Sequence, residues 1–170
     1  FLFGASATNL RVGRNGAILF NATAGDVSLT NADLKTSTST TANNIIAPFW
    51  DDLDVGGNIY ELTVGTAPNR QYIIEWRDVS HNNHLAGTLR FQVVFTENST
   101  DILFAYEDTV LGNATYDRAL SATVGIRSSS STNAIQYSFN QATLVDQMVI
   151  RIDGSNIAPT ITSTAPTTAT

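Results

Sequence analysis

The segment Thr88-Leu89-Arg90-Phe91-Gln92-Val93-Val94-Phe95 decides the fold class of this chain. Every second residue from Leu89 to Phe95 is apolar, and Arg90 and Gln92 lie between them. Successive side chains of a strand point to opposite faces, so this alternation predicts a strand with one buried face and one face in water. Strands of that kind are typical of antiparallel sheets.

Runs with a similar alternation recur on both sides of that segment. Residues 72–76, 102–106 and 135–139 repeat it, and in the last run Gln136 and Ser138 are expected to point away from the core. Further strand candidates are 10–12, 17–20, 45–50, 59–64, 124–126 and 148–152. Turn residues separate these runs, and about ten short strands of this kind predict an all-β fold, an antiparallel β-sandwich. Two long loops are expected, at 31–44 and 80–87.

The composition favours one globular domain and excludes several classes of function. The 170 residues are enough to bury a core, and 42% of them are apolar. Nine basic residues against fifteen acidic ones give a net charge of −6, so we expect no nucleic-acid partner and no anionic membrane surface. No apolar run approaches the ~20 residues of a membrane span. The chain has no Cys, which excludes disulfides, thiolate metal sites and thiol nucleophiles.

The composition changes near residue 153. Residues 1–153 carry the strand pattern and are expected to form the β-sandwich. Residues 154–170 are rich in Thr and contain Pro, and they carry no charge. This composition predicts an extended linker or a terminal strand.

Three carboxylates follow the run 45–50 within four positions, those of Asp51, Asp52 and Asp54. Such closely spaced like charges favour a bound cation, and Ca²⁺ takes several carboxylate and carbonyl oxygens. The spacing is a poor match to an EF-hand, because the twelfth position counted from Asp52 is Thr63 and not Glu. Two alternatives therefore stay open: a calcium site, or a solvated turn whose Asp side chains accept backbone N–H bonds.

The chain contains two histidines, His81 and His84, both in the expected loop 80–87 near Asp78. Two imidazoles and a carboxylate could bind zinc or copper or supply a general base, and the alternative is a polar hairpin loop. The motifs of serine hydrolases, zinc proteases and nucleotide-binding loops are missing. We therefore expect a protein that is not an enzyme.

Three large aromatic residues are candidates either for a sugar-binding platform or for the core. Tyr72 and Trp76 lie on the apolar face of their run, and Trp50 stands between Phe49 and the Asp residues. These positions favour the core for Tyr72 and Trp76, and they favour Trp50 as the anchor of its turn.

The run Asn43-Asn44-Ile45-Ile46-Ala47-Pro48-Phe49-Trp50-Asp51-Asp52-Leu53-Asp54 resembles the signature of the nidogen-like extracellular domain. The later strands at 91–95 and 102–106 are similar to strands of that family, and the resemblance covers most of residues 1–153. It implies an extracellular, non-catalytic β-rich module of adhesion, matrix or surface proteins. Animal members typically sit among Cys-rich modules, so a chain without Cys is expected to come from a prokaryotic surface protein.

Two functions follow as expectations for a protein that is extracellular or displayed on a cell surface. The first is an adhesion or matrix module that binds other surface or matrix proteins or glycans. The second is a structural subunit of a filament or surface layer that self-assembles by strand addition. The segments expected to add as strands lie near the two ends of the sequence and include Phe1, Leu2, Phe3, Thr160, Ile161 and Thr162. A third function, an enzyme built on His81 and His84, is disfavoured.

Overall fold

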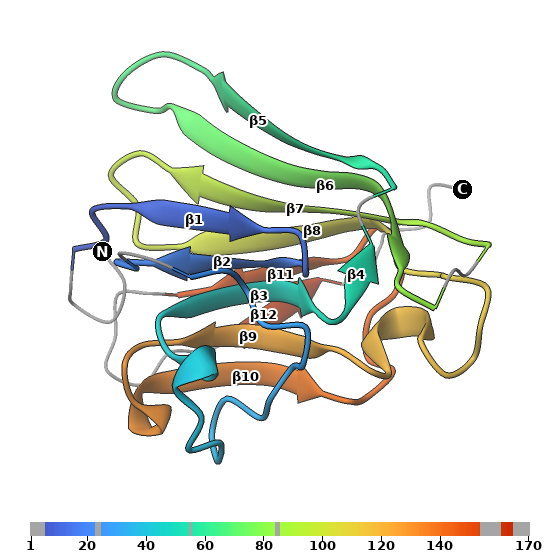
Figure 1. Ribbon diagram of the computed structural model, residues 1–170. Helices are drawn as coiled ribbons and strands as arrows, with labels where there is room; N and C mark the ends of the chain where they lie inside the picture. Colours follow the sequence, from blue (N-terminus) through green and yellow to red (C-terminus); the bar gives the residue numbers. More distant parts are fainter. Residues whose placement is uncertain (1–5, 23–24, 55, 84–85, 154–160, 165–170) are drawn as a thin grey trace.

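The computed structural model describes residues 6–22, 25–54, 56–83 and 86–153, and the backbone of residues 161–164. Within these residues the chain forms two antiparallel sheets, one of five strands and one of seven, that pack face to face (Figure 1). The prediction of an all-β antiparallel sandwich is confirmed. Helical structure in this part of the chain is limited to three 3₁₀ helices, Thr40–Ala42, Asp117–Ala119 and Ser131–Asn133. None of the described helices has the length and apolarity to cross a membrane.

The five-stranded sheet has the order β1-β2-β3-β9-β10. Its strands are β1 (Leu10–Gly13), β2 (Ala17–Phe20), β3 (Ile45–Trp50), β9 (Thr123–Arg127) and β10 (Ala134–Phe139). The β1–β2 hairpin turns at Gly16, which has a φ of +68°. A Cβ atom on Gly16 would lie 1.9 Å from the carbonyl oxygen of Phe49, so this turn requires glycine to pack against β3.

The seven-stranded sheet has the order β12-β11-β8-β7-β6-β4, and β5 also pairs with β6. Its strands are β4 (Leu53–Asp54), β5 (Asn58–Val64), β6 (Gln71–His81), β7 (Leu89–Thr96), β8 (Ile102–Asp108), β11 (Val149–Ile152) and β12 (Ile161–Thr164). The pairing of β5 with β6 is regular over all seven residues of β5. In this sheet, β5 is an outer strand (Figure 1).

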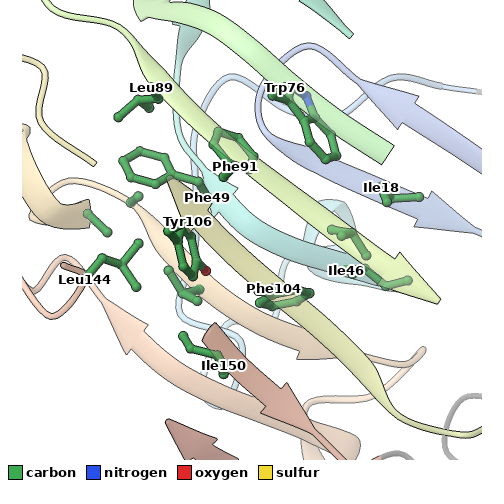
Figure 2. Close-up of a cluster of buried hydrophobic side chains, with 14 of the residues drawn as sticks. Ile18, Ile46, Phe49, Trp76, Leu89, Phe91, Phe104, Tyr106, Leu144 and Ile150 are labelled. Carbon is green, nitrogen blue, oxygen red and sulfur yellow. The ribbon is translucent and has the colours of Figure 1, made fainter. Parts of the chain in front are cut away.

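The core between the sheets is built around Phe91 of β7 (Figure 2). The strand register places Trp76, Phe91 and Tyr106 side by side, with ring centroids 5.0 Å and 6.5 Å apart. From β3, Phe49 stacks on Phe91 at 5.7 Å. Trp76 and Tyr106 also form hydrogen bonds to the backbone of the five-stranded sheet. Trp76 Nε1 donates to Gly13 O at 3.0 Å, and Tyr106 Oη donates to the carbonyl of Pro48 at 2.7 Å. These contacts hold the two sheets together.

The strand β3 is buried on both faces. Its inward residues Ile46 and Phe49 belong to the core between the sheets, whereas Ile45, Ala47 and Trp50 belong to a second apolar cluster. That cluster is completed on the outside by Val27, Leu34 and Ala42 of the long segment between β2 and β3. Trp50 Nε1 donates to Ser28 O at 2.8 Å, and the predicted anchoring role of Trp50 is confirmed.

Two local predictions are wrong. Ser138 was expected to face water but is buried. The pairing register between β9 and β10 shifts between Gln136 and Ser138, so Ser138 lies opposite Val124 and on the same face of the sheet as that core residue. The predicted loop 80–87 begins later than expected, because β6 continues through His81 and pairs there with β4.

Candidate functional site

The three Asp residues of the predicted calcium site have different local environments. Asp51 is buried, and its carboxylate accepts hydrogen bonds from Ser121 Oγ at 2.5 Å and from the backbone N–H of Asp52 at 2.9 Å. Asp52 accepts from Asn82 Nδ2 at 3.1 Å. Asp54 lies in β4, paired with Ser80.

The part of the chain that the structure describes contains no group of three or more His, Asp or Glu side chains placed to hold a metal. Instead, the carboxylates of Asp51 and Asp52 are occupied by donors of the protein itself. Calcium binding stays a prediction, and melting the protein in calcium and in chelator would test it.

The strand pairing brings together two candidate features that are separate in the sequence. Because Leu53 pairs with His81, His81 Nε2 lies 3.5 Å from Asp51 Oδ1. His81 Nδ1 accepts the backbone N–H of Asn83 at 3.2 Å, and Nε2 faces Asp51. The ring also contacts Tyr116, with centroids 4.2 Å apart. His84 lies outside the described residues.

This arrangement is not that of a nucleophile and its base. In such a pair the hydroxyl donates to an imidazole nitrogen, whereas Ser121 donates to Asp51 and both nitrogens of His81 have other neighbours. The buried polar contacts join the turn after β3, the end of β6 and the segment before β9. They indicate a structural role for this cluster.

The residues expected to add as strands are only partly described. Phe1, Leu2, Phe3 and Thr160 lie outside the described residues. Ile161 and Thr162 belong to β12, which pairs antiparallel with β11 of the same chain, Ile161 opposite Ile152 and Thr162 opposite Arg151.

The outer face of the seven-stranded sheet, the side turned away from the five-stranded sheet, carries a network that the sequence analysis did not identify. Glu75 of β6 is only 7% exposed although it lies on this face. Its carboxylate accepts from Arg77 Nε, from Arg90 Nε at 3.2 Å and from Gln92 Nε2 at 2.5 Å. Arg90 Nη1 also contacts Glu107 at 3.2 Å. We call Glu75, Arg77, Arg90, Gln92 and Glu107 the Glu75 network.

The network stabilises the ionised form of Glu75. Burial raises the pKa of Glu75, but the hydrogen bonds from Arg77, Gln92 and Arg90 together with the positive charge of Arg77 outweigh it, so the net pKa lies below the ordinary 4.5. Both oxygens are therefore held in place by donors from two strands. The alternation in the sequence places Ile73, Glu75 and Arg77 on one face of their strand. The sequence around them does not indicate which residues of β7 lie beside them, because that depends on the pairing of β6 with β7.

Exposed apolar side chains stand beside this network on β5. Tyr60 is 45% exposed and Leu62 is 57% exposed. The register places Tyr60 opposite Glu75 and Leu62 opposite Ile73. The Arg77 guanidinium carbon lies 4.6 Å from the centroid of the Tyr60 ring, a cation–π contact that ties β5 to the network.

Two hollows lie on either side of Gln92 on the outer face. One, of about 290 Å³, lies between β5 and β7 and is lined by Tyr60, Leu62 and Arg77, among others. The other, of about 260 Å³, lies between β7 and β11 and is lined by Arg90, Glu107 and neighbouring residues. Gln92 lines both.

Comparison with known proteins identifies the family. No curated protein and no solved structure matches the chain. The family model described as NIDO related matches residues 1–167, nearly the whole chain, and confirms the resemblance to the nidogen-like domain. The chain belongs to the NIDO-related family.

Proposed function

We propose that this chain is a non-catalytic extracellular module that binds protein or glycan partners through the outer face of its seven-stranded sheet. Membership of the NIDO-related family suggests an extracellular module. The observation that carries the proposal is the pairing of exposed Tyr60 and Leu62 with the ordered Glu75 network across adjoining strands.

The chemistry of this face suits recognition. Apolar and aromatic side chains supply contact area, and fixed polar groups supply orientation. Because Glu75 already holds Arg77, Arg90 and Gln92, a partner would meet polar groups whose positions are set before binding. Such preorganisation lowers the entropic cost of association.

The test is binding of the whole chain to an array of defined glycans and to an array of purified extracellular proteins. Gln92→Ala removes the side chain that lines both hollows and leaves Glu75 its two arginines. We expect a specific signal that Gln92→Ala weakens by about three- to tenfold, the equivalent of one hydrogen bond. Gln141→Ala, in the exposed loop after β10, is the matched control and should bind as the wild type does.

Two results would contradict the proposal. One is no probe bound above an unrelated β-sandwich protein on either array. The other is a bound probe whose affinity is the same for Gln92→Ala and Gln141→Ala, since that partner would bind elsewhere.

A second function, assembly of a filament or layer by strand addition, is favoured by one observation. The backbone of Ile161–Thr164 forms an edge strand on β11, and the same hydrogen bonds could be made to β11 of a neighbouring copy. That function predicts polymers that shorten in the full-length variant Thr162→Pro, which removes a backbone donor. A wild type that scatters light as single chains or dimers at all concentrations would exclude it.

A further inference from the structure

The strand β5 is a sheet edge that lacks most of the usual protection. It is seven residues long and pairs regularly with β6, and among the described residues no other strand pairs with it. It contains no Lys, Arg or Pro, and its one charged residue is Glu61, whose carboxylate accepts a hydrogen bond from Tyr72 Oη of β6. Natural proteins usually block such an edge with a charge, a Pro, a bulge or a covering segment, because its unpaired N–H and C=O groups can pair with another strand.

Apart from Ile59, which packs against the core, the apolar side chains of β5 are exposed. Tyr60, Leu62 and Val64 alternate on the outer face and are 45%, 57% and 37% exposed. They form half of the six large apolar side chains that are exposed in the described part of the chain. A free edge and an apolar stripe on one short strand together indicate an interface.

We propose that two copies of this chain pair through β5, antiparallel and about a two-fold axis, so that the two seven-stranded sheets become one continuous sheet. This interface differs from partner binding and from strand addition by β12, and it does not depend on either. The second copy is the occupant because the sequence of β5 is complementary to itself in one register.

That register places Leu62 opposite the second copy's Leu62. In the same register Tyr60 lies opposite the second copy's Val64. A two-fold axis perpendicular to the sheet keeps the outer side chains of both copies on the same face, so the apolar stripe of one copy continues into that of the other. Glu61 then lies opposite Thr63, an uncharged residue.

The alternative registers are poorer. With Glu61 on the axis, two carboxylates would lie directly opposite each other, which is unfavourable. With Tyr60 on the axis, Leu62 would lie opposite Asn58 and Val64 would have no partner. Five residues of each strand are paired in the Leu62 register, so we expect a reversible dimer that depends on concentration.

The first experiment measures the mass of the full chain by sedimentation over a concentration series. We expect monomer and dimer, with Leu62→Lys weakening the dimer at least about tenfold, because the substitution acts on both copies and places two ammonium groups opposite each other. Leu29→Lys is the matched control: Leu29 is 53% exposed, lies outside the sheets and should leave the dimer unchanged. Equal melting temperatures of the two variants would show that both are folded.

The second experiment uses the absence of Cys from the chain. Leu62→Cys should give a cross-linked dimer with a short bismaleimide, and Leu29→Cys should not. A wild type that stays monomeric throughout the series would overturn the proposal. So would a dimer that survives Leu62→Lys, or one that is lost only in Thr162→Pro, which would assign the contact to β12.

Discussion

The strands β3 and β5 are both short and rich in apolar residues, yet they occupy opposite environments. All six residues of β3 are buried, between the opposite sheet on one face and the segment 25–44 on the other. In β5, six of seven residues are exposed, and its sole partner among the described strands is β6. Apolar side chains stabilise this fold in β3, whereas the exposed Tyr60, Leu62 and Val64 of β5 are available for a contact with another molecule.

The largest expected effect is the difference in unfolding free energy between a variant of β3 and a variant of β5. Phe49→Ala should lower the free energy of unfolding by about 3–5 kcal/mol, because it leaves a cavity beside Phe91. Tyr60→Ala should cost less than about 1 kcal/mol, mainly the lost contact with Arg77. Urea unfolding of the two variants measures both values. Similar losses would contradict the assignment of β5 to a surface.

The turn that supports β3 gives the next effect. Gly16→Ala should cost about 2 kcal/mol or more, since the new Cβ would meet the Phe49 carbonyl and the φ of +68° is unfavourable for Ala. Gly112→Ala is the comparison, because Gly112 also has a positive φ, +76°, but its nearest neighbouring atom is 4.0 Å away. Equal losses in urea unfolding would show that backbone strain alone is responsible.

The buried polar cluster at the end of β3 should contribute less. Ser121→Ala removes a donor to Asp51 and should cost about 1–2 kcal/mol, because a buried carboxylate oxygen loses its partner. Asn82→Ala removes the exposed donor to Asp52 and should cost less than about 0.5 kcal/mol. If both variants unfold at the same urea concentration, the Asp51 cluster does not stabilise the turn.

The Glu75 network beneath Tyr60 should give a small effect that depends on pH. The pKa of folded Glu75 is below its ordinary value, so the stability it contributes is present above about pH 4.5 and is lost as the pH falls through the folded pKa. The difference in unfolding free energy between wild type and Glu75→Gln should therefore shrink as the pH falls below about 4.5. A difference that stays constant over this range would mean that ionised Glu75 does not stabilise the network.

The alternation of side chains was enough to predict most of the sandwich. The run from Leu89 to Phe95 predicted the centre of the larger sheet, because a strand buried on one face leaves a local pattern of period two. Ser138 escaped prediction because a bulge changes that period by one residue, and local composition does not mark it.

The site depends on contacts between distant parts of the chain, and these were not predictable. Ser121 donates to Asp51 across seventy positions, and Gln92 donates to Glu75 from the neighbouring strand. Tyr60 and Leu62 were predicted to be in a strand, but the sequence of one strand does not show whether it lies at the centre or at the edge of a sheet.

Hydrogen exchange of backbone amides at several protein concentrations tests the contrast between β3 and β5 most directly. We expect the amides of β3 to be strongly protected at every concentration, because they are buried in the centre of a sheet. The amides of β5 that do not bond β6 should exchange fast in dilute protein and become protected as the concentration rises and β5 pairs with a second copy. Exchange in β5 that is independent of concentration would contradict the account.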